Sequence, residues 1–280
     1  MSNVRVVTDS ACDLPQELVD ELGIEIVPLT IRFGDAEFVD RVELSTAEFW
    51  RRSAASATLP ETAAPAPGQF EAAYRKLAAE GADAVCVVSL SSELSATMQS
   101  ALLAANAVRD EIPVEVVDSR SVTIGQGMIA VAAARAARDG ADLAAVAGRA
   151  RSVAARTRVW GALDTLENLR KGGRIGGARA LLASVLSIKP IIEVRDGRVE
   201  EGGRQRTRSK ALAFLVEKVR EAGPIEALAV LQADADDVGE LVARLQPLAP
   251  GEIVVGDIGP VVGTHAGRGT IGVVFQVPER

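Results

Sequence analysis

The chain has 280 residues and a net charge of −7, a length near which one hydrophobic core gives way to two domains. Aromatic residues make up only 3%, so the apolar positions are mainly Ala, Val, Leu and Ile, as is typical of parallel strands covered by helices. The acidic balance and the lack of a dense run of Lys or Arg argue against nucleic acid as a partner.

The cysteines and the N-terminal segment indicate the compartment. Cys12 and Cys86 do not make a disulfide framework in a chain of this length, and we expect both to be buried, reduced thiols. The first residues show no charged region followed by a long apolar stretch, so we expect no signal peptide. No uncharged apolar run approaches the roughly 20 residues that span a bilayer. We therefore expect a cytoplasmic protein without stable insertion into a membrane.

Strand-like and helix-like segments alternate over the first 155 residues. Short β-branched runs predict strands at residues 4–8, 24–33, 84–90 and 114–117. Apolar periodicity and capping residues predict helices at residues 13–22, from 45 onward, and at 69–80, 95–109, 126–138 and 143–155. Asp13 is the expected cap of the first helix, and residues 53–68, rich in Ala, Thr and Pro, are expected to form a loop or lid. This alternation predicts βαβ units and a parallel sheet.

The pattern changes after residue 155. Two short strands, at residues 191–194 and 198–200, flank Asp196 and Gly197, a pair that predicts a β-hairpin. Further helices are expected at residues 210–222 and 238–245, and further strands at 225–232, 253–257 and 270–277. We therefore predict an α/β protein of two domains. Residues 1–155 form an N-terminal parallel-sheet α/β domain, and residues 156–280 form a C-terminal α+β domain that contains the hairpin.

One glycine motif is misleading. Gly267, Gly269 and Gly272 have the spacing of a dinucleotide-binding loop, but such a loop follows a strand and opens a helix, whereas here a strand-like run follows. We interpret the match as a coincidence. P-loop and nucleophile-elbow motifs are absent from the sequence, and the carboxylates and one histidine show no metal-ligand spacing. We expect no cofactor, no metal and no nucleotide site.

Hydroxyl side chains gather where the strand at residues 84–90 gives way to a helix. They are Ser91, Ser92, Ser95 and Thr97. At such a junction backbone N–H groups and the helix dipole favour an anion. Simple helix capping would account for only one of these hydroxyls, so an anion site and capping both remain open.

Residues 169–177 combine cationic side chains with two glycine pairs. Glycines let a loop approach a ligand closely, and Arg174 can hold a carboxylate or phosphate through two hydrogen bonds. A helix C-terminus would explain Arg170 and Gly172, but it would not explain the second glycine pair or Arg174.

His265 is the only histidine. A lone histidine is more often structural than catalytic, but small neighbours are expected to expose its ring in a loop, and histidine changes charge near neutral pH. Together with the hydroxyls and Arg174, it would suit one small anion.

In six segments, in the same order and almost end to end, the chain resembles the DegV family of bacterial fatty-acid-binding proteins. These segments are residues 8–10, 89–101, 117–119, 172–175, 186–190 and 263–267. The family is similar to the lipid-carrier subunits of bacterial fatty acid kinases. The resemblance implies that a long-chain fatty acid is enclosed between two domains. It also implies that a separate ATP-dependent kinase phosphorylates the carboxylate, giving acyl phosphate for phospholipid synthesis.

The resemblance also implies roles for individual residues. Ser91 and Ser92 match the family's serine motif at the carboxylate, and Thr62 falls where the family has a threonine that also touches it. Arg174 and His265 match residues that are needed for phosphoryl transfer or kinase contact. The expected fatty-acid-binding set also includes the nearby hydroxyls of Ser95 and Thr97.

One departure from the family pattern keeps alternatives open. Residues 62–66 read Thr-Ala-Ala-Pro-Ala, where the family usually reads Thr-Ser-Gln-Pro-Ser. Chain preference and coupling to a kinase are therefore open. A carrier that is not itself an enzyme is the leading hypothesis. The alternatives are a self-sufficient small-molecule phosphotransferase or hydrolase that uses His265, and a lipid sensor that is never phosphorylated.

Overall fold

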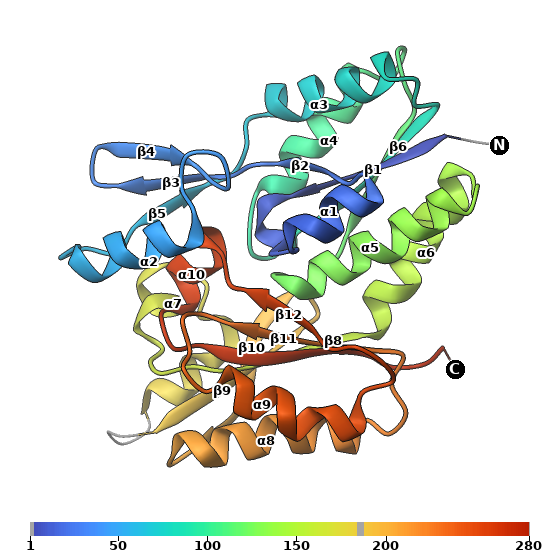
Figure 1. Ribbon diagram of the computed structural model, residues 1–280. Coiled ribbons are helices and arrows are strands. Elements are labelled where there is room, and N and C mark those ends of the chain that lie inside the picture. Colours follow the sequence, from blue (N-terminus) through green and yellow to red (C-terminus); the bar gives the residue numbers. More distant parts are fainter. Residues whose placement is uncertain (1–2, 184–187, 280) are drawn as a thin grey trace.

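The computed structural model describes residues 3–183 and 188–279. Two open sheets and the helices that cover them make up most of the molecule (Figure 1). The first sheet has four parallel strands in the order β2-β1-β6-β7. They are β1 (Val4–Asp9), β2 (Glu25–Val27), β6 (Ala84–Ser89) and β7 (Val114–Asp118). Every residue of β6 is buried, because helices cover both faces of a parallel sheet. The predicted parallel sheet is confirmed.

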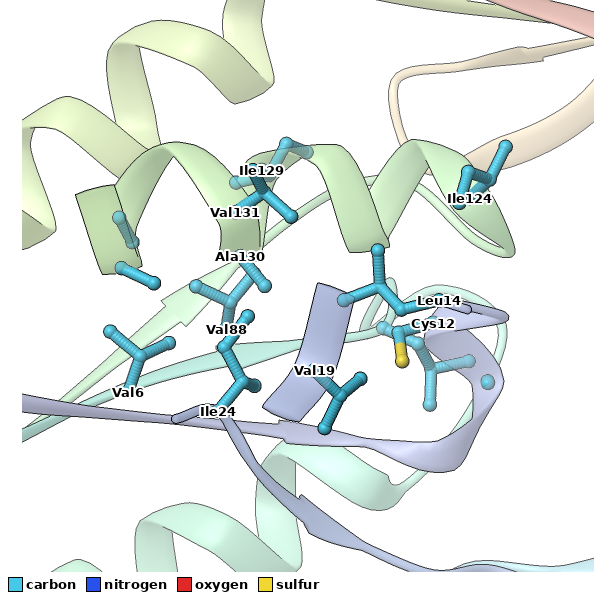
Figure 2. Close-up of a cluster of buried hydrophobic side chains, with 14 of the residues drawn as sticks. Val6, Cys12, Leu14, Val19, Ile24, Val88, Ile124, Ile129, Ala130 and Val131 are labelled. Carbon is cyan, nitrogen blue, oxygen red and sulfur yellow. The ribbon is translucent and has the colours of Figure 1, made fainter. Parts of the chain in front are cut away.

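Helices pack on both faces of this sheet. One face is covered by α3 (Pro67–Ala79) and α4 (Thr97–Ala107), and the other by α1 (Gln16–Leu22), α5 (Ile124–Arg138) and α6 (Leu143–Arg156). Figure 2 shows Val6 and Val88 of the sheet beneath Ala130 of α5. The small and branched side chains of α5 let the helix lie close to the strands.

The second sheet has six strands in the order β10-β9-β8-β13-β11-β12 and mixed direction. Its strands are β8 (Thr157–Ala162), β9 (Lys189–Arg195), β10 (Arg198–Gln205), β11 (Ala227–Gln232), β12 (Val254–Asp257) and β13 (Ile271–Gln276). The predicted hairpin is confirmed as β9 and β10, joined at Asp196 and Gly197, which both have positive φ as a type I′ turn requires. Helices α8 (Arg208–Glu221) and α9 (Val238–Leu245) cover the outer face.

A middle layer of helices, which contains α5 and α6, joins the two sheets. The hydrophobic cluster that contains α5 and α6 also contains Val159 of β8, Leu231 of β11 and Val274 of β13. The molecule is therefore a stack of alternating helical layers and sheets, which confirms the predicted α/β class. The boundary near Ala155 falls at the end of α6, and the division into domains 1–155 and 156–280 stays a prediction. No helix within the described ranges has the length and apolar character to cross a membrane.

A third, small sheet corrects two expectations. It has the order β4-β3-β5 and consists of β3 (Thr30–Phe33), β4 (Ala36–Val39) and β5 (Glu61–Ala63). The single strand expected over 24–33 is wrong, since the chain divides into β2 and β3 at Pro28, which has no N–H to donate. The loop expected over 53–68 contains β5, whose short polar sequence has no strand pattern and is recruited by pairing with β3.

Several short elements had no sequence signal that we recognised. They are α10 (Pro260–Ala266) and the 3-10 helices η1 (Ser10–Cys12), η2 (Gly176–Ala183) and η3 (Gln246–Leu248). The short helix α7 (Glu167–Lys171) ends at Gly172, which agrees with the helix C-terminus that was one reading of Arg170 and Gly172. By contrast, α2 (Thr46–Ala55) begins at the predicted cap, Ser45, whose hydroxyl accepts a hydrogen bond from the Glu48 N–H. In Figure 1, α10 lies beside α2 and α7, between the small sheet and the six-stranded sheet.

Asp13 does not cap α1, contrary to the prediction. That helix begins at Gln16 without a side-chain cap. Asp13 is instead buried in a left-handed conformation and accepts hydrogen bonds from the Thr123 hydroxyl at 2.6 Å and the Gly259 N–H at 3.0 Å. These partners are distant in sequence, so no local pattern could reveal them.

Buried carboxyl groups surround this position. Burial raises the pKa of Asp13 to about 8, and burial raises the pKa of Asp9 and that of Asp40 to about 6. Desolvation is the largest cause in each, because an ionised carboxylate loses its hydration in the interior. Burial similarly raises the pKa of Cys12 and that of Cys86 to about 12, and both are free thiols, as expected from the sequence.

We expect the free energy of unfolding to fall as pH rises from 6.5 to about 8. The folded pKa of Asp13 is raised from 3.8, so its stabilising contribution is fully present below 3.8 and is lost as pH rises through about 8. His265 does not interfere above 6.5, its ordinary pKa, because its folded pKa is lower. In Asp13→Asn the free energy of unfolding should fall less between pH 6.5 and about 8, as measured by urea denaturation at both ends of this range. Equal slopes in the two proteins would show that Asp13 is already ionised in the fold.

Candidate functional site

A cavity of about 90 Å³ lies between the parallel sheet and the six-stranded sheet. Aliphatic side chains from both halves of the chain form most of its wall: Leu29, Leu90, Leu94, Val122, Leu169, Ile192, Val194, Val199, Val261, Val262 and Ala266. Four polar side chains complete the wall: Thr62, Ser95, Arg174 and His265. The structure thus brings together four residues that the sequence analysis singled out.

His265 lies in the last turn of α10 and contacts a residue of the small sheet. Its Nε2 atom is 3.2 Å from Oγ1 of Thr62. The expectation of an exposed ring in a loop is wrong, because His265 is half-buried in α10, which packs against α2 and α7. Burial, and then the Arg174 cation, lowers the pKa of His265 to about 4. The imidazole is therefore neutral at pH 7, contrary to the expectation of a group that titrates near neutrality.

The surroundings of the ring indicate its tautomer. Nδ1 is buried, and within residues 3–183 and 188–279 it has no hydrogen-bond partner. A buried N–H without an acceptor is costly, so we assign the proton to Nε2, where Oγ1 of Thr62 accepts it. The Thr62 hydroxyl hydrogen is then available to a ligand in the cavity.

Arg174 is held by backbone carbonyls. Its Nη1 donates to the Gly172 carbonyl at 2.8 Å and its Nε to the Leu94 carbonyl at 3.1 Å. Among the described residues no carboxylate forms an ion pair with Arg174. A half-buried cation without a counter-ion beside an apolar cavity favours an anionic ligand.

Of the clustered hydroxyl residues Ser91, Ser92, Ser95 and Thr97, only Ser95 lies at the cavity. Ser95 lines the cavity, and its Oγ lies 2.9 Å from the Oγ1 of Thr97, which is buried and is not part of the cavity wall. Ser91 donates its hydroxyl to the Gly197 carbonyl at 2.7 Å, and Ser92 donates to a carboxylate oxygen of Asp118 at 2.6 Å. Neither serine lines the cavity. A role in binding a carboxylate stays a prediction for all of these residues.

The departure at residues 62–66 falls on β5 and on the residues that lead into α3. Thr62 pairs with Ile31 of β3 and is half-buried, whereas the next residue, Ala63, is exposed, as alternation along a strand requires. The glycine motif at residues 267–272 ends α10 and leads into β13, so it opens no helix. Of the matched segment 186–190, residues 186 and 187 lie outside the described residues.

The aliphatic part of the wall was not predicted from the sequence. Leu94, Val122 and Val262 have the same residue types as the ordinary core, so composition does not distinguish them. A helix C-terminus was one of two readings of Gly172, and Gly172 does cap the end of α7, but it also faces His265. The described residues contain no group of three or more His, Cys, Asp or Glu that could hold a metal. The cavity combines an aliphatic wall, an unpaired cation and two hydroxyls, which suits a carboxylate with an apolar tail.

Gly172→Ala should displace the His265 ring. A Cβ at this position would lie 2.3 Å from Nδ1 of His265, and the φ of −76° allows alanine, so the effect is steric. We expect a loss of about 1–3 kcal/mol in the free energy of unfolding and a shifted NMR signal of the single imidazole.

Gly148→Ala in α6 is the matched control for this substitution. None of the described residues lies within 4 Å of the added methyl group, and alanine favours a helix over glycine by about 1 kcal/mol. It should stabilise the protein and leave the imidazole signal in place. An unchanged signal in Gly172→Ala would contradict the assigned position of the ring.

Comparisons with known proteins cover nearly the whole chain. The family described as "Uncharacterised protein, DegV family" matches residues 3–277. A DegV domain-containing protein of Streptomyces coelicolor is 37% identical, and the match covers 98% of each chain.

Two solved structures share the fold. A DegV family protein from Thermus thermophilus, described as binding fatty acid, has a TM-score of 0.90 at 34% identity, covering 99% of this chain and 100% of that one. DegV from Bacillus subtilis, described as a fatty acid binding protein, has a TM-score of 0.88 at 29% identity with the same coverage. With a family match over almost every residue and a shared fold, this chain belongs to the DegV family.

Proposed function

We propose that this protein binds a long-chain fatty acid in the cavity between its two sheets and presents the carboxylate to a separate ATP-dependent kinase in the cytoplasm. The kinase would form acyl phosphate for phospholipid synthesis. The observation that carries the proposal is Arg174, a cation that has no counter-ion among the described residues and lies at a mainly aliphatic cavity. Fatty acid binding by the relatives from Thermus thermophilus and Bacillus subtilis supports it.

Burial of the acyl tail supplies the binding energy. Each buried methylene contributes about 0.8 kcal/mol, so a long chain contributes on the order of 10 kcal/mol before ordering costs. The cavity of about 90 Å³ is smaller than the roughly 300 Å³ at which ligand pockets begin. The wall must therefore open, and separation of Leu94 and Val122 from Ile192 and Val199 would do this without dividing either sheet.

The carboxylate would lie at the polar residues. Arg174 would neutralise its charge, while Thr62 would donate its hydroxyl, oriented by Nε2–H of His265. One carboxylate oxygen would attack the γ-phosphorus of ATP, the bond to the bridging oxygen would break, and ADP would leave. Arg174 would offset the negative charge that gathers at this point. The neutral His265 would act first as a hydrogen-bond donor, and an arriving carboxylate would raise its pKa.

A specific observation favours the alternative of a self-sufficient hydrolase. The distance of 3.2 Å between His265 and Thr62 resembles that of a nucleophile and its base. A base needs a pKa near the working pH, however, and burial lowers the pKa of His265 to about 4. Its Nδ1 also lacks an orienting acceptor among the described residues. The carrier is therefore the better-supported function.

The first experiment is mass spectrometry of lipid released by denaturing the purified protein. We expect about one fatty acid per chain, and we expect Arg174→Ala to weaken fatty acid binding about tenfold or more, through the loss of charge-assisted hydrogen bonds. Arg244→Ala on α9, which removes an exposed arginine far from the cavity wall, is the control and should bind normally. If no lipid is released and none binds on addition, the proposal is wrong.

The same preparation separates the other two hypotheses. Ester or phosphoester hydrolysis by the protein alone, lost in His265→Ala, would favour the hydrolase. Bound fatty acid that no candidate kinase phosphorylates in the presence of ATP would favour a lipid sensor. Phosphorylation that depends on the kinase, on bound fatty acid and on Arg174 is the result expected for a carrier.

Val122→Phe should weaken binding of the acyl chain by about tenfold, because the larger ring fills the aliphatic part of the cavity and leaves the polar residues intact. Val42→Phe is the matched control, since Val42 is 74% exposed and lies outside the cavity wall. Titration with a fluorescent fatty acid analogue measures both variants, with thermal melting to confirm folding. Equal affinity in the two variants would place the acyl chain elsewhere.

A further inference from the structure

The helix that carries His265 is held at its start by a side chain from the first segment of the chain. Asp13 accepts a hydrogen bond from the N–H of Gly259, the residue just before α10, at 3.0 Å. Its other carboxyl oxygen accepts from the hydroxyl of Thr123, the residue just before α5, at 2.6 Å. Asp13 is 7% exposed, so water does not compete for either hydrogen bond.

Helix α10 depends on such contacts for its position. It has only seven residues, too few for a helix to be stable by itself. In its middle, Gly263 packs on Phe49 and Trp50 of α2 so closely that a Cβ there would lie 2.9 Å from both rings. Near its end, the Asn168 side chain of α7 donates to the Thr264 carbonyl at 3.1 Å. Asp13 supplies the corresponding contact at the start.

The glycine at position 259 shows how close this contact is. Its φ of −74° is one that any residue adopts, so backbone conformation does not require glycine. A Cβ there, however, would lie 2.7 Å from Oδ1 of Asp13. The carboxyl group cannot easily move away, because both of its oxygens form hydrogen bonds in the interior. A side chain at position 259 would therefore displace either Asp13 or the start of α10.

We propose that Asp13 is a positioning residue that holds the start of α10, so that Nε2 of His265 stays within reach of Thr62 and of a bound carboxylate. The part that concerns the bound carboxylate rests on the proposed function. Asp13 touches no ligand itself and acts through Gly259 and the seven residues of α10. It also links the middle helical layer to this site, since Thr123 directly precedes α5.

The single histidine makes this proposal directly measurable. NMR of the imidazole gives one signal, because the chain has one histidine. In delipidated protein, Asp13→Ala should shift this signal and raise the pKa of His265 from about 4 toward its ordinary 6.5, since the ring loses its buried setting. Asp13→Asn should keep the wild-type signal. Its amide oxygen can accept from Gly259, and its amide nitrogen can donate to Thr123.

Gly259→Ala disturbs the same contact from the other side. It should shift the imidazole signal in the same way. In the double variant with Asp13→Ala, the new Cβ no longer clashes with the Asp13 carboxyl group, so the signal should shift by less than the sum of the two single-variant shifts. The control is Asp142→Ala, which removes the carboxylate that caps α6 by accepting from the Ala145 N–H. It should lower stability without moving the signal.

The outcomes separate this proposal from the proposed function. A wild-type signal and pKa of His265 in folded Asp13→Ala would overturn the positioning role, whether or not the protein binds lipid. If Asp13→Ala does not fold, Gly259→Ala decides, and an unmoved signal there would overturn it equally.

Kinase assays at saturating fatty acid test the consequence for transfer. In Asp13→Ala the kinase should phosphorylate the bound fatty acid about tenfold more slowly, and Asp13→Asn should restore the rate. A wild-type rate in folded Asp13→Ala would contradict the link between Asp13 and transfer.

Discussion

The close packing of α5 between the two sheets is the constraint on which the rest of the structure depends. A Cβ on Gly125 would lie 2.8 Å from a methyl group of Val159 in the six-stranded sheet. A Cβ on Gly127, two residues later, would lie 2.6 Å from the Cys12 carbonyl on the side of the parallel sheet. The backbone of α5 is thus close-packed on both sides at these two glycines, and this close packing fixes the separation of the sheets. The cavity takes its narrow width from this separation, because its walls come from both halves of the chain.

The polar residues of the cavity show how burial and charge work together. Backbone carbonyls accept hydrogen bonds from the Arg174 guanidinium in place of water. His265 beside it is neutral because burial and the neighbouring cation both oppose a second positive charge. The site therefore offers one positive charge and directed hydrogen-bond donors, which match a single carboxylate. Two cations here would require a ligand of higher charge or a partner that supplies one.

Asp13 adds a connection between the packing and the site. The carboxyl group is buried and both oxygens are used, so it acts as a fixed spacer between the start of α5 and the start of α10. A rearrangement that opens the cavity must either keep this spacer or break two buried hydrogen bonds, each worth about 1–3 kcal/mol if left unmade. Opening by small movements of aliphatic side chains is therefore less costly than rotation of one sheet against the other.

Sequence by itself determined the elements whose signals are local. Helix α9 occupies residues 238–245 as predicted, the hairpin turns at Asp196 and Gly197, and α2 starts at Ser45. Each signal depends on residues within a few positions of one another, through apolar periodicity, positive φ or a side-chain cap. The strands at residues 84–90 and 114–117 were equally clear, because β-branched runs mark strands, whether fully buried as β6 or half-buried at the sheet edge as β7.

Only the tertiary structure decided which predicted residues meet. Thr62 and His265 are 203 positions apart, and Asp13 and Gly259 are 246 apart, so no local pattern reports either contact. Ser91 and Ser95 have the same side chain four residues apart, yet only Ser95 lines the cavity, because the turn before α4 directs Ser91 to the Gly197 carbonyl. The tertiary structure also decided the charge state of His265. Its pKa depends on burial, and the elements that bury it come from distant segments of the chain.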